Sequence, residues 1–161
     1  MRSEQETTEA IGRYADTVRR LCLVHLVNRS DLDDVFQSVF LKYALRDEQF
    51  ESFDHEKAWL IRVTLNACKD ATKSRMRRRA VSLDEVASVP VDAPSDHRDV
   101  LEAVLSLPEK NRNVVYLHYY EGYTAPEIGR LLGMNTNTVY TLLTRSKKLL
   151  RKKLGGGRHD A

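Results

Sequence analysis

The chain of 161 residues has little glycine (7), little proline (4), only 2 cysteines and no long apolar run. No stretch approaches the roughly 18 consecutive apolar residues of a membrane span, and the polar amino terminus carries no apolar segment of a signal peptide. We therefore expect no membrane insertion and a cytoplasmic location. Because glycine and proline are scarce and apolar residues recur at helical spacing, the sequence predicts an all-α fold.

Residues that usually build catalytic or metal centres are also few and scattered. Cys22 and Cys68 lie in apolar helical patterns without a CxxC motif, which predicts buried free thiols rather than a metal site or a disulfide. No nucleophile, base and orienting group can be combined, and no glycine-rich phosphate loop is present. We therefore expect no catalytic residue, no metal and no cofactor, so the chain is predicted not to be an enzyme.

Charge is abundant, and it is segregated along the chain. Hydrophobic residues make up 42% and charged residues 30% of the sequence, so a packed core is expected. The net charge of +3 hides eight basic residues against one acid over residues 57–79, one against five over 80–100, and ten against five over 101–161. Two basic blocks around an acidic spacer predict two surfaces that bind polyanions.

Helices dominate the first half of the predicted structure. Apolar residues at three-and-four spacing from Ile11 onward indicate a first helix that ends near residue 28. Ser30 is the predicted N-cap of a second helix, whose apolar stripe continues to Tyr43. Residues 46–56 lose this periodicity, which indicates a loop.

The third predicted helix, from about residue 55 to residue 79, carries a basic face. At about 100° per residue, six residues fall on that face: Arg62, Asn66, Lys69, Asp70, Lys73 and Arg77. Trp59 lies at its edge. Cations that follow phosphates, beside an aromatic surface that stacks on bases, are typical of proteins that bind unpaired nucleic acid. Simpler interpretations stay open: Trp59 is a core residue, and the arginines at 75 and 77–79 form a solvated helix end.

A linker separates the two basic blocks. Residues 80–97 hold two prolines among small and acidic residues, without an apolar period. The predicted organisation is a first domain over residues 1–79, this acidic linker, a second domain over 98–155 and a disordered tail over 156–161.

The second domain contains signals of a helix-turn-helix motif. The segment Ser-Leu-Pro-Glu at 106–109 combines an N-cap, an early proline and a capping glutamate, and Thr-Ala-Pro-Glu at 124–127 repeats the device. Gly133 permits a turn, and Asn135 can cap a last helix that runs from residue 136 to about residue 154. A capped helix, a turn with glycine and a second helix are typical of this motif.

The last predicted helix has an apolar side and a polar side. The apolar side holds Val139, Leu142, Leu143, Leu149 and Leu150, and the polar side holds Asn137, Tyr140, Thr141, Thr144 and Lys148. A major groove admits one helix, and amide, hydroxyl and basic groups on its free face can bond to base edges and phosphates. An ordinary solvated amphipathic helix has the same pattern, but the preceding capped helix and Gly133 favour DNA binding.

Over nearly its whole length the chain resembles the small two-domain sigma factors of bacteria, the extracytoplasmic-function group. In the first domain the resemblance rests on residues 31–40 and on residues 58–66 with the basic run after them. It implies that residues 31–40 lie on the helix that docks on the polymerase clamp. Polymerase binding is then implied for Asp33, Asp34, Gln37 and Lys42. Acids at this helix end also compensate the helix dipole, and both roles are compatible.

Residues 58–66 resemble the segment with which this family melts promoters and recognises the minus-ten element. The resemblance implies minus-ten DNA contacts for Phe53, His55, Trp59, Arg62, Asn66, Lys69, Lys73, Arg75 and Arg77. Phe53 and His55 belong to the loop that would hold a base turned out of the stack. Arg75 and Arg77 would contact the backbone at the upstream edge.

In the second domain the resemblance rests on residues 107–110, 121–122, 127–128, 132–134 and 138–139. It implies minus-thirty-five DNA contacts for Thr136, Asn137, Tyr140, Thr141, Thr144, Arg145 and Lys148. After Val139 the family commonly has a basic residue, a small residue and an arginine. This chain instead has Tyr140, Thr141 and Leu142, so two cations of the family pattern are absent.

The resemblance implies an alternative sigma factor that binds core RNA polymerase at its clamp and flap and directs promoter recognition and DNA opening. Promoter DNA is the second implied partner, and many members are also held by an anti-sigma factor. In the family the linker passes through polymerase channels, where its negative charge would mimic a nucleic-acid strand. A solvated flexible tether is the simpler interpretation of this segment. Two alternatives stay open: a stand-alone helix-turn-helix regulator, and an interaction protein held chiefly by an inhibitory partner.

Overall fold

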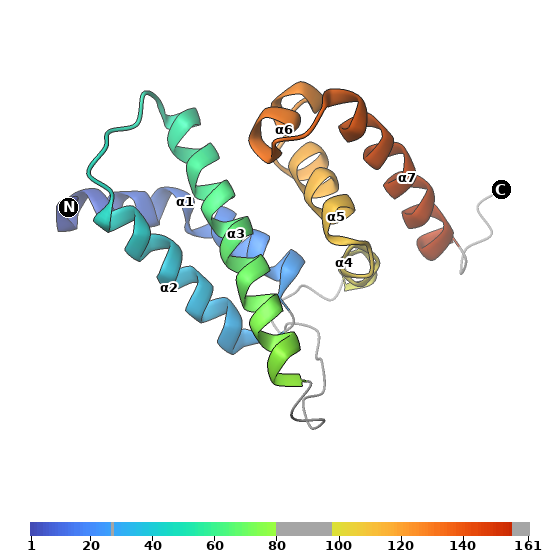
Figure 1. The fold of residues 1–161 in the computed structure, drawn as a ribbon, viewed down its shortest axis with the longest axis horizontal. Helices are drawn as coiled ribbons and strands as arrows, with labels where there is room; N and C mark the ends of the chain where they lie inside the picture. The colour runs from blue at the N-terminus through green and yellow to red at the C-terminus, as the bar shows by residue number, and fades with distance from the viewer. Residues whose placement is uncertain (27, 80–97, 156–161) are drawn as a thin grey trace. The chain divides into compact units, whose positions relative to one another are not determined.

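The computed structural model describes residues 1–26, 28–79 and 98–155, and within these ranges every regular element is a helix (Figure 1). This confirms the predicted all-α class. The chain divides into two compact units, Met1–Pro90 and Val91–Ala161. The predicted linker and tail lie outside the described residues. In the described part, no helix has an apolar window long enough to cross a bilayer.

The first unit is a bundle of α1 (Glu4–His25), α2 (Arg29–Leu45) and α3 (Phe53–Arg79), in which each helix packs against the other two. Its core includes Ala10, Tyr14, Val18, Cys22, Val35, Val39, Phe40, Tyr43, Leu60 and Cys68. Both cysteines are buried free thiols, as predicted. Because the core residues recur at helical spacing, each helix presents one side to the bundle and the other to solvent.

Side-chain caps define where the first two helices begin. The Ser3 hydroxyl accepts a hydrogen bond from the Glu6 N–H at 3.1 Å, and the Asn28 side-chain oxygen accepts one from the Asp31 N–H at 2.7 Å. The second cap corrects the prediction that Ser30 caps α2. Asn28 has the extended backbone (ψ 156°) that an N-cap requires, whereas Ser30 already lies within the helix.

The second unit consists of α4 (Arg98–Leu105), α5 (Glu109–Val115), the π-helical turn η2 (Tyr116–Tyr120), α6 (Ala125–Leu132) and α7 (Thr136–Gly155). Its core includes Leu107, Val114, Leu117, Ile128, Val139 and Leu143. Helix α7 packs against α4, α5 and α6. Inside this core the Asn111 amide donates to the Ser146 hydroxyl at 2.9 Å, so a buried polar pair joins α5 to α7.

The start of α5 differs from the prediction. Pro108 is the N-cap residue and makes no side-chain capping bond. The Ser106 hydroxyl instead donates to the Ala103 carbonyl at 2.6 Å, at the end of α4. A serine between two helices can satisfy either the last carbonyls of the first helix or the first N–H groups of the second. Because two residues separate Ser106 from Glu109, the first residue of α5, the Ser106 hydroxyl bonds to the end of α4 instead.

The start of α6 and the turn between α6 and α7 have the predicted geometry. Thr124 and Glu127 form a reciprocal capping box, with N···O distances of 3.3 and 2.9 Å. Gly133 is left-handed (φ +69°), and the Asn135 side chain accepts from the Asn137 N–H at 2.9 Å. Because both ends of the turn are capped, α6 and α7 are held as a helix-turn-helix pair.

Gly129 makes this turn tight, and replacing it should destabilise the second unit. A Cβ at Gly129 would lie 2.6 Å from the Met134 carbonyl oxygen, which is backbone and cannot rotate away. We expect Gly129→Ala to lower the free energy of unfolding of this unit by about 1–3 kcal/mol. Gly12→Ala is the matched control, because nothing lies within 4 Å of that site on α1 and alanine should stabilise it slightly. Denaturant unfolding of both variants measures the difference, and equal midpoints would contradict the proposed close approach.

Candidate nucleic-acid interface

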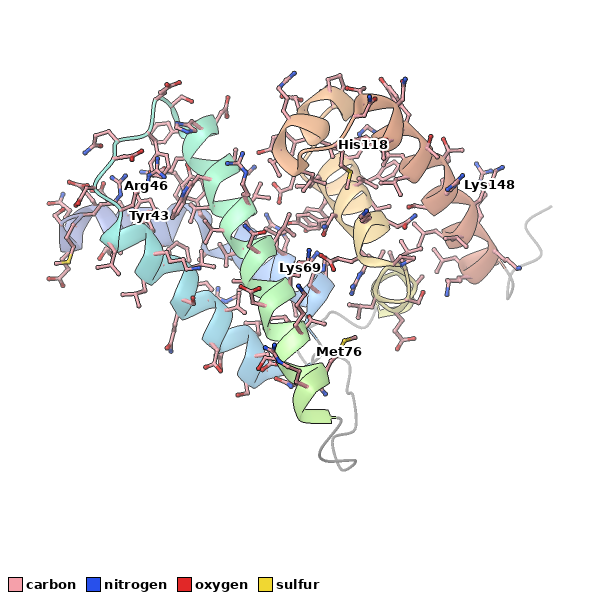
Figure 2. All side chains as sticks on the ribbon, viewed as in Figure 1. Tyr43, Arg46, Lys69, Met76, His118 and Lys148 are labelled. Carbon is pink, nitrogen blue, oxygen red and sulfur yellow. The ribbon has the colours of Figure 1, made fainter. Side chains whose placement is uncertain are left out.

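The exposed side of α3 brings most of the predicted minus-ten residues into one row. Arg62, Asn66, Lys69, Lys73 and Arg77 are all exposed, whereas Leu60, Ile61, Thr64 and Cys68 are buried. We call these five exposed residues the α3 basic face. Lys69 and Met76 mark its course in Figure 2. Met76 is 66% exposed and lies three residues after Lys73, so an apolar group interrupts the basic row. No signal in the sequence distinguished it from a core methionine.

Arg75 does not belong to the α3 basic face. It is 7% exposed, and one guanidinium nitrogen lies 3.7 Å from the Asp31 carboxylate at the start of α2. The resemblance places Arg75 beside Arg77 at the DNA, but residues two apart on a helix point about 200° from each other. Its burial therefore removes Arg75 from the candidate contact surface and makes it a link between α2 and α3.

The α2–α3 loop (residues 46–52) is packed onto an aromatic cluster. The Phe50 ring centroid lies 6.0 Å from that of Tyr43 and 5.6 Å from that of Trp59. The Arg46 guanidinium lies 4.6 Å from the Phe50 ring centre. Trp59 is half-buried among these groups and packs against the core of the unit, as the simpler of its two interpretations expects.

Phe53 and His55 face solvent where the loop meets α3. Phe53 is 68% exposed. The His55 ring is exposed, and its Nδ1 accepts from the Glu51 N–H at 3.1 Å, while the Ser52 hydroxyl accepts from the His55 N–H at 3.1 Å. The ring is thus fixed by its own loop. Both side chains are exposed at the amino-terminal end of α3, where the Phe53 ring lies against Arg13 and the His55 ring against Phe50.

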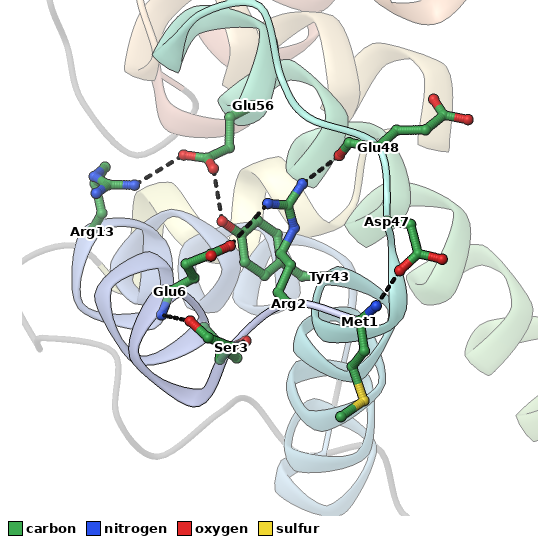
Figure 3. Close-up of polar contacts among 10 residues, drawn as sticks. Met1, Arg2, Ser3, Glu6, Arg13, Tyr43, Asp47, Glu48 and Glu56 are labelled. Atoms are coloured by element: carbon green, nitrogen blue, oxygen red, sulfur yellow. Dashed lines mark hydrogen bonds and ion pairs between the residues drawn. The ribbon is translucent and has the colours of Figure 1, made fainter.

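A buried carboxylate beneath the loop was not predicted (Figure 3). Glu56 accepts from Arg13 at 2.9 Å and from the Tyr43 hydroxyl at 2.8 Å. Burial, and then the Glu56 carboxylate, raise the pKa of Tyr14 and of Tyr43 to about 12, so both hydroxyls stay protonated even in alkaline solution that would ionise an exposed tyrosine. In the sequence Glu56 looks like an ordinary acid in the first turn of a helix, which is why this network had no signal.

The outer side of α7 carries the predicted minus-thirty-five residues. Asn137, Tyr140, Thr141, Thr144, Arg145 and Lys148 are exposed, and Thr136 is half-buried at the first turn (Lys148 is labelled in Figure 2). We call the six exposed residues the α7 polar face. Leu149, predicted on the apolar side, is 38% exposed, and the buried position is taken by Ser146. The hydrogen bond from Asn111 allows this serine to be buried, and periodicity alone did not indicate that pair.

The four predicted polymerase contacts lie on the outside of α2. Asp33, Asp34, Gln37 and Lys42 are all exposed. Two further residues extend this surface, because Leu41 is 60% and Leu45 57% exposed. Asp34, Gln37, Leu41 and Leu45 follow one line along the helix at three-and-four spacing. We call this line the α2 outer strip, and an exposed apolar pair of this kind suits a protein partner better than DNA.

Two family profiles match the chain, one in each unit. The profile described as Sigma-70 region 2 matches residues 10–78, and the profile described as Sigma-70, region 4 matches residues 97–150. The first match runs from residue 10 in α1 to residue 78 in α3, and the second covers α4, α5, η2, α6 and α7 up to residue 150.

Curated proteins similar to the chain carry sigma-factor names. RNA polymerase sigma factor SigV of Bacillus subtilis is 28% identical over 159 residues, covering 94% of this chain and 95% of SigV. ECF RNA polymerase sigma factor SigW of the same organism is 28% identical over 165 residues, covering 91% and 87%. ECF RNA polymerase sigma factor SigE of Mycolicibacterium smegmatis is 30% identical, covering 91% of this chain and 60% of SigE.

Solved structures with the same fold agree with these matches. The sigma factor RpoE of Bartonella quintana, solved with the anti-sigma factor NepR, has a TM-score of 0.80 at 19% identity and covers 96% of this chain and 99% of its own. CnrH, solved with the cytosolic domain of CnrY, has a TM-score of 0.69 at 21% identity, covering 96% and 91%. With both sigma-70 regions present in order, and with SigV and SigW matched over 95% and 87% of their lengths, the chain belongs to the extracytoplasmic-function sigma factors, the alternative initiation factors of bacterial RNA polymerase.

Proposed function

We propose that this sigma factor recognises promoters with two exposed helix faces, one in each unit. The α3 basic face, with Phe53 and His55 beside it, binds the opened minus-ten strand. The α7 polar face enters the major groove of the minus-thirty-five duplex. One observation supports the division most strongly: in each helix the polar and basic residues share the exposed side, while the opposite side is buried in its own unit.

The α3 basic face has the chemistry for an unpaired strand. Arg62, Lys69 and Lys73 supply cations at three-and-four spacing, and such charges bind phosphates without regard to sequence. The Asn66 amide lies between them and can donate to and accept from a base edge. Phe53 offers an exposed ring on which a base can stack. Contacts available only after strand separation favour the opened promoter, so binding shifts the equilibrium towards opening.

The α7 polar face separates positioning from recognition. Arg145 and Lys148 lie towards the carboxyl half of the helix, where cations contact phosphates and set the register. Asn137 and Thr141 lie in the first two turns, the part of a recognition helix that reaches base edges. Because Tyr140 and Leu142 carry no charge where the family commonly has a basic residue and an arginine, sequence preference here depends on amide, hydroxyl and ring contacts.

The α2 outer strip is the proposed contact with the polymerase clamp. Reversing charge there, in Asp34→Lys combined with Gln37→Lys, should weaken binding to core polymerase by at least about tenfold, because the proposed contact would lose its carboxylate and gain two cations. Binding of the isolated chain to minus-thirty-five duplex should not change. Fluorescence anisotropy with labelled core polymerase measures the first effect.

Glu9→Lys combined with Gln5→Lys is the matched control for the strip. Both residues are exposed in the first turns of α1, and the pair undergoes the same change of charge. Equal losses in the two double variants would show that net charge, and not the α2 outer strip, determines binding to polymerase.

Run-off transcription tests the proposed function as a whole. Core polymerase supplied with this chain should start RNA at defined positions on a genomic DNA library, and core polymerase alone should not. A chain that binds duplex DNA but forms no complex with core polymerase would instead be a stand-alone helix-turn-helix regulator. Membership of the sigma family disfavours that alternative.

We also propose that an anti-sigma protein competes with core polymerase for this chain. RpoE and CnrH were each solved with a protein partner, named in the first case as an anti-sigma factor. Leu41 and Leu45 are exposed apolar side chains that such a partner could cover. A regulator that acts in this way should be displaced from the chain by an excess of core polymerase.

A further inference from the structure

Arg2 is buried against the α2–α3 loop, although arginine is seldom buried. It is 8% exposed and donates to the Glu48 carbonyl at 2.6 Å (Figure 3). Its guanidinium carbon lies 4.7 Å from the Tyr43 ring centre and 4.9 Å from the Phe50 ring centre. One side chain from the segment before α1 therefore holds both the backbone and the aromatic anchor of this loop.

The backbone of the same segment is also fixed. The Arg2 N–H donates to the Ala44 carbonyl at 2.7 Å, in the last turn of α2, and the Arg2 side chain lies 3.5 Å from the Glu6 carboxylate. Ser3 then caps α1. These contacts fix the backbone at Arg2, and they therefore fix the position from which its guanidinium reaches the loop.

Helix α1 holds the other end of the loop as well. The Tyr14 hydroxyl donates to the Phe53 carbonyl at 3.3 Å, and the Arg13 guanidinium lies 4.6 Å from the Phe53 ring centre. Arg13 also pairs with the buried Glu56 at 2.9 Å. The loop is thereby held at both ends by residues that lie far from it in the sequence, while Phe53 remains exposed.

We propose that Arg2 is a positioning residue for promoter opening: it fixes the shape of the α2–α3 loop and so presents Phe53 and His55 to the opened strand, without contacting DNA itself. This inference rests on the proposed function of the α3 basic face. Phe50 is the one apolar residue of the loop, so the loop has little apolar packing of its own. The contacts of Arg2 with the Glu48 carbonyl and the Phe50 ring hold it in place instead.

Arginine suits this position better than lysine. A planar guanidinium can stack on two rings and donate in its plane to a carbonyl at the same time. A lysine ammonium keeps the charge and the length of the side chain but forms no such stack. Arg2→Lys is therefore the informative variant, because charge is preserved and only the geometry of the contact is lost.

The experiment compares open-complex formation by core polymerase with the full chain on two templates, duplex promoter and the same promoter with its minus-ten region mismatched and already open. We expect Arg2→Lys to lower opening on duplex by about tenfold and initiation on the mismatched template by less than about twofold. Arg19→Lys is the control, since its guanidinium also stacks on a ring, that of Phe36 at 5.0 Å, away from the loop. It should match the unsubstituted chain on both templates.

Three outcomes would overturn the inference. Equal activity of Arg2→Lys and the unsubstituted chain on duplex would remove the role. A similar loss on both templates, accompanied by a lower unfolding temperature, would reduce Arg2 to a general contributor to stability. A similar loss in Arg19→Lys would show that any stacked arginine has the effect. If the unsubstituted chain started no RNA with core polymerase, the proposed function itself would fail, which is a separate result.

Discussion

Replacing Arg62 and Lys69 together with alanine should lower the rate of promoter opening by about 100-fold while core polymerase still binds the chain. Both side chains are exposed on the α3 basic face and lie seven residues apart, so they sit above one another on the helix. Each charge-assisted contact to a phosphate contributes about 1.5 kcal/mol or more, and two such losses multiply. Reactivity of unpaired thymines in the minus-ten region measures opening directly.

The control for this variant must lose the same charge from the same unit. Arg19→Ala combined with Lys57→Ala removes two cations that lie outside the α3 basic face, Lys57 being on the other side of α3. This control should open promoters at close to the normal rate. If both double variants lost opening equally, the effect would come from net charge, and the assignment of the face would be wrong.

Removing Arg145 and Lys148 from α7 should give the second large effect, a loss of about 10- to 100-fold in affinity for minus-thirty-five duplex at moderate salt. Both residues are exposed on the α7 polar face. Each phosphate contact releases about one counterion, so the slope of log affinity against log salt should become shallower by about 1.8 for the pair. Titrations of labelled duplex at several salt concentrations provide both quantities.

Lys110→Ala combined with Lys153→Ala tests whether position matters in the second unit. Lys110 is exposed on α5, and Lys153 is exposed on α7 but points away from the α7 polar face. We expect the salt slope of this control to stay close to that of the unsubstituted chain. An equally shallow slope in both variants would mean that DNA contacts the unit through diffuse charge.

Most local features of the fold could be predicted because they depend on neighbours in the sequence. The box of Thr124 and Glu127, the left-handed Gly133 and the cap at Asn135 each involve residues within a few positions of one another. The N-cap of α2 was placed two residues late, at Ser30 instead of Asn28. Both residue types favour caps, and only the backbone conformation distinguishes them.

The two candidate faces could also be predicted from spacing along the sequence. The burial of Arg75 and of Ser146 could not. Helical periodicity assigned Arg62, Lys69 and Lys73 to one side of α3, because 3.6 residues make a turn wherever the helix lies. Arg75 looks similar in the sequence but is buried against Asp31. Likewise, Ser146 takes the interior place expected for a leucine, because Asn111 from another helix satisfies its hydroxyl.

The sequence by itself determined the helices, the segregation of charge and the two polar faces, since these follow from spacing along the chain. Tertiary structure alone decided how the α2–α3 loop is held. Arg2 and Tyr14 donate to backbone carbonyls at its two ends from distant positions in the sequence, and Glu56 accepts from the Tyr43 hydroxyl beneath it. Local periodicity carries no information about which buried polar groups will meet across a bundle. Such groups are tolerated only where packing brings a partner within hydrogen-bond distance, and that condition belongs to the folded chain.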